Sequence, residues 1–263
     1  MRILIEKEPQ VGIVLDVSFV GFDGFSCLKW LHRDEKCDIL QVTLGSLSLM
    51  SPFSDDDIPV GSVEFIRKFA ELAEIKLPAP LNIPDSIKPD ARKVVHAPGL
   101  VRHVQREIFT AKRKDIKEFP VFVKPLSDVK AFTGFVADND KAFDLYPIDW
   151  DSMDLLCSEP INANILSEWR CYILGGKIVN VSNYSGDPIL FPNIGTIETT
   201  IYNHTDAPAA YSMDFAVVEW GERINLTVLI ECNDAWALGP YGCPPELYAK
   251  MIRNRWKEII KNQ

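Results

Sequence analysis

The sequence lacks the features that mark several classes of protein. Its six cysteines include no Cys-x-x-Cys pair, and its four histidines show no zinc-ligand spacing. We therefore expect reduced, structural thiols. The longest apolar stretch, residues 11–20, is interrupted by Asp16 and is too short to cross a bilayer. Glu6 follows too soon for a hydrophobic signal region to form, so we expect a cytoplasmic protein.

Basic charge is also scarce. The chain has 28 Lys and Arg residues against 37 Asp and Glu residues, which gives a net charge of −9. No segment carries the basic stripe that a nucleic-acid backbone requires, so nucleic acid is an improbable partner. About 47% of the residues are hydrophobic and 25% are charged, which is typical of a folded protein. The 263 residues allow one large or two modest domains.

Prolines divide the chain into two parts. Because proline cannot donate a backbone hydrogen bond, a crowded run of prolines between residues 78 and 98 predicts an extended linker, with a domain boundary near residue 97. Before it, residues 3–5, 12–17 and 39–44 are expected to be strands, and Ser62 is expected to cap a helix. Residues 1–97 are therefore predicted to form a small α/β domain.

The second part has clearer strand and helix patterns. We expect a buried strand over residues 119–125, a hairpin of residues 168–174 and 177–184 around Gly175-Gly176, and a strand pair over residues 211–220 and 224–233. Pro244-Pro245 should open a helix with a core-facing apolar stripe. That stripe consists of Leu247, Met251, Ile252, Trp256, Ile259 and Ile260.

Three oxygen-bearing side chains are candidates for a magnesium site. Side chains alternate along a strand, so Glu231 and Asn233 project to one face. An even-numbered hairpin loop would put Asp214 opposite or diagonal to Glu231 on that face, and an odd loop would separate them. Magnesium prefers such oxygen ligands. The alternative is that the three residues cap strand ends at the surface.

Two cations are candidates for phosphate contacts. Lys124 ends a buried-type strand, where it is either a phosphate partner or a surface lysine with a buried stem. Arg170 lies inside a strand and needs an anionic partner, either Glu168 or a phosphate. Lys130, Thr133 and Gly134 could form a loop over phosphates. The acidic run 55–57 is expected to be a solvated loop.

Taken in order, five segments resemble those of the ATP-grasp superfamily. They are 121–125 (VFVKP), 156–161 (LCSEPI), 168–178 (EWRCYILGGKI), 213–215 (MDF) and 229–233 (LIECN). The resemblance covers roughly residues 100–243 and is greatest to a small phage and bacterial branch. It implies an α+β ATP-grasp fold, in which two α/β subdomains (98–160 and 161–263, the larger with the C-terminal helix) clasp ATP after the small N-terminal α/β domain.

The resemblance also implies roles for individual residues. Lys124 and Arg170 would be catalytic, with Lys124 on the nucleotide phosphates and Arg170 near the transferred phosphoryl group. Asp214, Glu231 and Asn233 would bind Mg²⁺. The phosphate loop is reduced to residues 131–134. The remaining nucleotide-binding candidates are Lys112, Lys130, Thr133, the adenine-reading hinge at Ser158, Glu159 and Ile161, and Glu168.

The family's chemistry suggests an ATP- and Mg²⁺-dependent carboxylate-amine ligase. A carboxylate attacks the γ-phosphate of ATP, and an amine takes the resulting acyl phosphate to give an amide or peptide bond. The acid and the amine would belong to an amino acid, a peptide or a protein. Two alternatives stay open: an ATP-using enzyme of nucleic-acid end processing or ligation, and a module that binds nucleotide without turnover.

Overall fold

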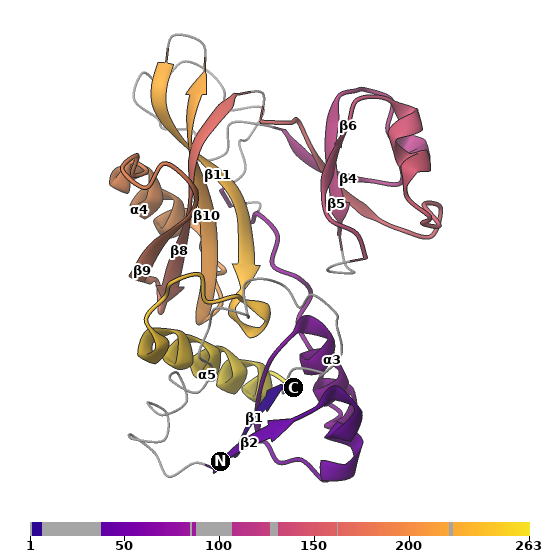
Figure 1. Cartoon of the computed structure of the whole chain (residues 1–263), viewed down its shortest axis with the longest axis vertical. Helices are drawn as coiled ribbons and strands as arrows, with labels where there is room; N and C mark the ends of the chain where they lie inside the picture. Colours follow the sequence, from indigo (N-terminus) through magenta and orange to yellow (C-terminus); the bar gives the residue numbers. More distant parts are fainter. Residues whose placement is uncertain are drawn as a thin grey trace.

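The computed structural model describes residues 2–6, 38–84, 86–87, 107–126, 131–161, 163–220 and 223–263. Within these ranges the chain forms three β-sheets with a few helices packed against them, which is an α+β architecture (Figure 1). The strand expected over residues 12–17 and the boundary near residue 97 lie outside the described residues. The division into domains therefore stays a prediction.

The first sheet is parallel and has the order β2-β1-β3. It consists of β1 (Arg2–Glu6), β2 (Asp38–Val42) and β3 (Ile58–Val60), followed by helix α3 (Val63–Leu72). Ser62 caps α3 as expected, because its hydroxyl accepts a hydrogen bond from the backbone N–H of Phe65 at 3.2 Å. Strand β2 ends earlier than expected, since the 3₁₀ helix η1 (Leu44–Met50) begins two residues later.

One expectation for this region is wrong. Asp55 and Asp56 are exposed, but Asp57 is buried at 1% exposure and does not belong to a solvated loop. Its carboxylate accepts hydrogen bonds from the guanidinium of Arg2, with Nε at 2.8 Å, and from the backbone N–H of Ser54 at 2.8 Å. The expectation failed because the sequence of the acidic run gives no sign that Asp57 pairs with Arg2, which lies 55 residues away in the chain.

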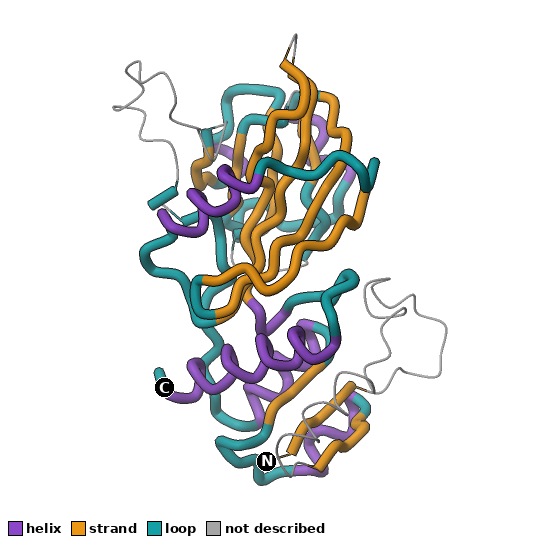
Figure 2. Tube along the Cα trace, turned by 90° about the vertical axis from the view of Figure 1, so that its left-hand side faces the viewer, coloured by secondary structure: helices purple, strands orange, loops and turns teal. Residues whose placement is uncertain are grey.

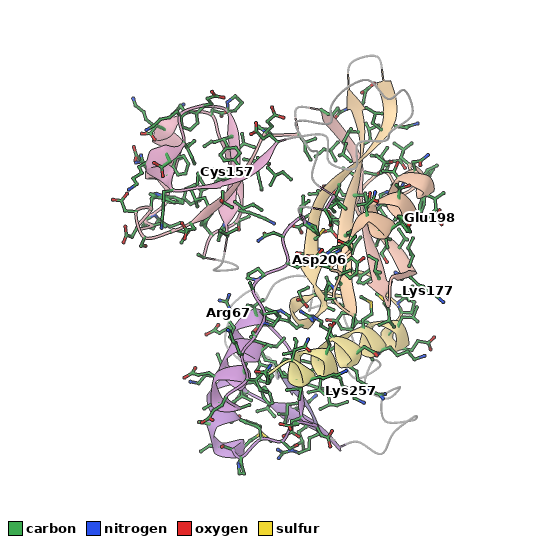
Figure 3. The ribbon with its side chains drawn as sticks, turned by 180° about the vertical axis from the view of Figure 1, so that it is seen from behind. Arg67, Cys157, Lys177, Glu198, Asp206 and Lys257 are labelled. Atoms are coloured by element: carbon green, nitrogen blue, oxygen red, sulfur yellow. The ribbon has the colours of Figure 1, made fainter. Side chains whose placement is uncertain are left out.

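The second, smaller sheet is antiparallel and has the order β4-β7-β5-β6. Its strands are β4 (Ile108–Ala111), β5 (Val121–Pro125), β6 (Phe135–Ala137) and β7 (Leu155–Ser158), with the 3₁₀ helices η2 (Arg113–Asp115) and η3 (Asp140–Leu145) between them. Val123, Phe143, Trp150 and Cys157 are among the buried residues of its own core. Figure 3 labels Cys157 in this sheet, on the opposite side of the molecule's upper half from Glu198 of helix α4 (Ile194–Asn203).

The third, larger sheet is antiparallel with the order β11-β10-β8-β9. It is built from β8 (Asn164–Leu174), β9 (Lys177–Gly186), β10 (Ala210–Trp220) and β11 (Arg223–Asp234). Gly175 and Gly176 have φ of 56° and 72°, so the primed turn predicted for this hairpin is confirmed. Helix α4 (Ile194–Asn203) packs its buried side on one face of the sheet, and the other face carries the polar candidates.

The C-terminal helix α5 (Pro245–Lys261) joins the first sheet to the larger sheet. The expected apolar stripe is confirmed, because Met251, Ile252, Trp256 and Ile259 are buried in one core with residues of both sheets. Figure 2 shows α5 crossing below the strands of the larger sheet. Within the described ranges no helix is long and apolar enough to cross a membrane, and the four described cysteines are buried, free thiols.

Candidate functional site

Charged groups from the smaller and the larger sheet meet at one point. Lys124, on β5 of the smaller sheet, lies with its Nζ 3.5 Å from Oε2 of Glu231 on β11 of the larger sheet. The other oxygen of Glu231, Oε1, lies 3.8 Å from Nη2 of Arg170 on β8. The structure therefore brings together two catalytic candidates and one metal-ligand candidate that are far apart in the sequence.

Arg170 is held by Asp214 on the neighbouring strand β10. The two residues are directly opposite each other in the β8–β10 pairing, and Asp214 accepts hydrogen bonds from Nε at 2.8 Å and Nη2 at 2.7 Å. Both side chains are buried. Glu168 is therefore not the ion-pair partner of Arg170, which corrects one of the two expected alternatives. The reason is geometric, because the planar guanidinium of Arg170 can bond to both oxygens of the Asp214 carboxylate on the neighbouring strand.

The protonation of this pair reflects its burial. Burial alone would lower the pKa of Arg170, but the bonds and charge of Asp214 hold that pKa above its ordinary value. Burial raises the pKa of Asp214 to about 7 against the effect of Arg170. Among the described residues Nη1 of Arg170 donates no hydrogen bond, in contrast to Nε and Nη2.

Glu231 and Asn233 occupy the end of β11 on the same face as Asp214. Asp214 lies directly opposite Glu231, so the shared face expected for an even-numbered loop is confirmed, although the β10–β11 pairing shifts register twice between Trp220 and Asp214. The amide of Asn233 donates a hydrogen bond to Oε1 of Glu231 at 2.9 Å. Burial alone would raise the pKa of Glu231, but Lys124, the Asn233 amide and Arg170 together hold it below its ordinary value. Glu231 is thus an ionised carboxylate among cations, and its side chain is 32% exposed.

Two tyrosines that sequence reasoning missed complete the surroundings of Arg170. The Arg170 guanidinium carbon lies 4.5 Å from the ring centre of Tyr241 and 5.9 Å from that of Tyr184. The Tyr184 hydroxyl donates to Oε2 of Glu168 at 3.1 Å. The nucleotide-binding candidate Glu168 therefore pairs with this tyrosine. Tyr184 sits at a β-bulge and Tyr241 in a loop, so strand alternation does not reveal either contact.

The three hinge candidates lie on the segment that leads from β7 into β8. Ser158 is buried at the end of β7. The backbone N–H of Glu159 donates to the carbonyl of Glu107 at 3.1 Å, and its carboxylate accepts from the Glu107 N–H at 3.2 Å. Ile161 packs against an apolar floor on the larger sheet, formed by Ala216, Val218 and Val228.

The remaining nucleotide-binding candidates belong to the smaller sheet. The ammonium of Lys112 lies 3.1 Å from the carboxylate of Asp154 and donates to the carbonyl of Ser152. Thr133 is exposed. A Cβ atom on Gly134 would lie 2.7 Å from the ring of Phe122 and 3.2 Å from the Cβ of Lys124, so a side chain at this position would press on both residues. Lys130 lies outside the described residues.

The donor set suits magnesium better than a metal that needs a complete protein cage. Among the described residues no three His, Cys, Asp or Glu side chains form a ready-made metal site. Glu231 and Asn233 nevertheless offer adjacent oxygen donors. Asp214 lies opposite them with both oxygens bonded to Arg170. Magnesium commonly takes one or two carboxylates and completes its shell with water and substrate phosphates.

Comparisons with known proteins agree with this architecture. The sequence profile described as "ATP-grasp domain, R2K clade family 2" matches residues 103–251, more than half of the chain. No curated protein sequence matches the chain significantly.

Three similar solved structures share the arrangement of the elements. The D-alanine–D-alanine ligase from Bacillus anthracis aligns with 100% of this chain and 99% of its own at 14% identity and a TM-score of 0.54. The same enzyme complexed with ATP aligns over the same shares at 15% identity and a TM-score of 0.53. A RimK domain ATP-grasp protein from Sphaerobacter thermophilus aligns with 96% of this chain and 100% of its own, at 14% identity and a TM-score of 0.50. At sequence identities this low, the similarity of these structures shows a common fold and nothing more.

Proposed function

Because the chain belongs to the ATP-grasp superfamily, in the R2K clade, we propose that it is an ATP- and Mg²⁺-dependent carboxylate-amine ligase that forms an amide or peptide bond. The observation that carries the proposal is the meeting of Lys124 from the smaller sheet with Glu231 and Arg170 from the larger one. Two cations can contact the phosphate oxygens of ATP, and an ionised carboxylate beside them can bind the metal ion that accompanies those phosphates.

ATP would lie along the polar face of the larger sheet. The apolar floor of Ala216, Val218 and Val228, with Ile161 packed on it, offers a surface for the adenine ring. Backbone groups of the segment around Ser158 and Glu159 would read the adenine edge. Ala216 is two residues from Asp214 on the same strand, so phosphates leaving this floor would run toward Arg170 and Lys124.

Glu231 and Asn233 would hold Mg²⁺ together with the phosphates, and Asp214 would supply a further oxygen at its unused lone pairs. When bound, the ion would neutralise the charge of the phosphate oxygens. This assignment rests on the side chains that the strand register places on one face. Lys130 and Thr133 stay proposed phosphate-loop residues, Lys112 a proposed nucleotide lysine and Glu168 a proposed nucleotide-site carboxylate.

The protein's own groups would promote transfer by position and charge. Nη1 of Arg170 and the ammonium of Lys124 would stabilise the charge that spreads over the γ-phosphoryl oxygens as the substrate carboxylate attacks. The acyl phosphate formed would be taken by an amine with release of phosphate. We propose an amino acid, a peptide or a protein as the source of the acid and the amine, in line with the D-alanine–D-alanine ligase neighbours.

Three measurements test the proposal. Calorimetry should detect ATP binding that strengthens with Mg²⁺. ADP release should then require both an acid and an amine from a panel of amino acids and short peptides. Hydroxylamine, added in place of the amine, should trap the acyl phosphate as a hydroxamate. ATP binding without ADP release under every combination would instead favour a nucleotide-binding module, and a lack of ATP binding would reject the proposal.

A further inference from the structure

We propose that Tyr241 is a positioning residue, which holds the guanidinium of Arg170 in the orientation that phosphoryl transfer needs before any substrate arrives. The inference rests on the proposed function, since it names a further residue of the same site. Its starting point is that Asp214 alone does not hold Arg170. The two hydrogen bonds to Nε and Nη2 fix the guanidinium within the plane of the fork.

The face of the guanidinium is covered by aromatic rings. Tyr241 lies over it at 4.5 Å, and the ring of Tyr184 is farther away at 5.9 Å. The two rings contact each other with their centres 5.7 Å apart, so Tyr184 also supports Tyr241 from the side. A ring on the face and a carboxylate on one edge leave the Nη1 edge for an anion.

The backbone of Tyr241 is strained. Its φ is 29°, a backbone angle that residues other than glycine rarely adopt. Such a conformation persists only where surrounding contacts impose it, and it clusters at functional sites. The neighbouring Gly242 has φ of 79° and lies close to Ser182 of β9, which brings this loop directly over the strand beside Arg170.

Contacts with the three residues before Tyr241 hold this part of the loop in place. The buried hydroxyl of Tyr172 donates to the carbonyls of Gly239, at 3.2 Å, and Pro240. The hydroxyl of Tyr248 on α5 donates to the carbonyl of Leu238. Tyr172 is two residues from Arg170 on β8, so the strand that carries the arginine also carries the anchor of the loop that covers it.

The start of the same loop is fixed by a buried ion pair. Asp234, which follows Asn233, caps the 3₁₀ helix η4 (Ala235–Ala237) through the backbone N–H of Trp236 at 3.3 Å. Arg255 of α5 donates to both carboxylate oxygens of Asp234, at 2.7 and 2.6 Å. Buried and bidentate, this pair determines where the loop leaves β11. The strained conformation of Tyr241 is therefore supported from β8 and from α5.

The test compares Tyr241→Asn with Tyr241→Phe. Asparagine tolerates a positive φ but has no ring, whereas phenylalanine keeps the ring and loses only the hydroxyl. The readout is the ratio of the ADP Kd to the ATP Kd with Mg²⁺ present, because this ratio isolates the γ-phosphate contact. Tyr241→Asn should lower the ratio by about threefold to tenfold while the ADP Kd changes less than twofold. Tyr241→Phe should leave the ratio unchanged.

A second measurement does not depend on nucleotide. Hydrogen exchange at Nε–H of Arg170, followed by NMR in the ligand-free protein, should speed up in Tyr241→Asn and stay unchanged in Tyr241→Phe. Tyr172→Phe, which removes the loop anchor without touching Tyr241, should speed up exchange as well and replaces Tyr241→Asn if that variant does not fold.

The outcomes separate this inference from the proposed function. Equal losses of ADP and ATP affinity in Tyr241→Asn, or an unchanged ratio with unchanged exchange at Arg170, would overturn the positioning role. If the wild-type protein binds neither nucleotide, the proposed function fails. The exchange of Arg170 Nε–H then decides alone whether Tyr241 holds the guanidinium.

Discussion

Lys124 and Arg170 are both cations of the candidate site, but the protein holds them differently. Arg170 is buried, has two short bonds to Asp214 and is covered by aromatic rings. Lys124 has one long ion-pair contact among the described residues, 3.5 Å to Glu231, and its side chain is 24% exposed. Arg170 is therefore oriented in advance, whereas Lys124 can exchange its carboxylate for a phosphate at little cost.

We expect Lys124→Ala to weaken ATP binding while the protein stays folded. Loss of a charge-assisted phosphate contact should cost about 1.5–3 kcal/mol of binding free energy, measured by calorimetry. Lys177→Ala is the matched control, because that lysine is exposed beside the glycine turn. Equal ATP affinity in wild type and Lys124→Ala would remove Lys124 from the site.

For Arg170→Lys we expect phosphoryl transfer to fall more than ATP binding. An ammonium cannot reproduce the planar fork that binds Asp214 and still presents Nη1 to a phosphoryl oxygen. The kcat for ADP release should decrease by more than the ATP Kd increases. Parallel losses in both quantities would indicate that the arginine serves only to stabilise the buried pair.

At the scale of secondary-structure elements, the β8–β9 hairpin depends on glycine at two positions for different reasons. Gly175 has φ of 56°, and a Cβ there would meet nothing within 4 Å. Gly186 has φ of 72°, and a Cβ there would lie 2.2 Å from the backbone oxygen of Leu166. The first position needs only a left-handed backbone, and the second also needs a close approach of two strands.

Gly175→Ala should therefore lower the free energy of unfolding by about 1–2 kcal/mol, the cost of a left-handed alanine. Gly186→Ala should cost that amount and about 1–3 kcal/mol more, because the added methyl group forces the strands apart. Denaturant titration of both variants measures the difference. Similar losses would show that the β8–β9 pairing can shift to admit the methyl group.

Asp57, which immediately precedes β3 of the first sheet, makes stability depend on pH. Burial alone would raise the pKa of Asp57, but Arg2 and the Ser54 backbone hold it below its ordinary value. A lowered pKa gives stability that is present above the unfolded value of about 3.9 and is lost as the pH falls through the folded value. Asp57→Asn should therefore lose about 1–3 kcal/mol at neutral pH and show little difference from wild type at lower pH.

Asp56→Asn serves as the control, because Asp56 is exposed in the same acidic run. Its free energy of unfolding should follow that of the wild type at every pH. If the free energies of unfolding of Asp57→Asn and wild type differ by the same amount at every pH, the charge of the Asp57 carboxylate does not contribute to stability.

Local patterns predict much of the candidate site, because strand alternation and the two-residue glycine turn depend on neighbours in the sequence. The glycine turn and the shared face of Glu231 and Asn233 follow from such patterns, whereas the position of Asp214 opposite Glu231 also depends on two register shifts between Trp220 and Asp214. The partner of Arg170, the burial of Asp57 and the stack of Tyr241 do not, since each depends on a tertiary contact or a loop conformation. A bulge also displaces Tyr184 from the register of a regular hairpin.

At the scale of the whole molecule, α5 makes the first and the larger sheet share one core. Trp256 is 2% exposed, and its ring packs on Phe69 of α3 with the centres 5.7 Å apart. Tyr172 and Ala210 of the larger sheet belong to the same core. The smaller sheet has a separate core of its own.

Trp256→Ala should therefore destabilise both parts that share the core, by about 3–5 kcal/mol. Lys257→Ala is the control, since Lys257 is exposed on the same helix (Figure 3). Calorimetric unfolding should show one transition shifted to lower temperature while a transition of the smaller sheet moves less. A uniform shift of the entire profile would show that the smaller sheet unfolds with the rest.

The ion pair of Lys124 and Glu231 makes two binding events interdependent. A phosphate that binds Lys124 releases Glu231, and a metal ion that binds Glu231 releases Lys124. Whichever ligand binds first therefore breaks the Lys124–Glu231 ion pair, and the second ligand no longer has to break it. Such coupling is reciprocal: nucleotide must raise the affinity for the ion by the same factor by which the ion raises the affinity for nucleotide. Removing the ammonium abolishes this contribution, so the Kd of nucleotide in Lys124→Ala should depend less steeply on the Mg²⁺ concentration than in the wild type.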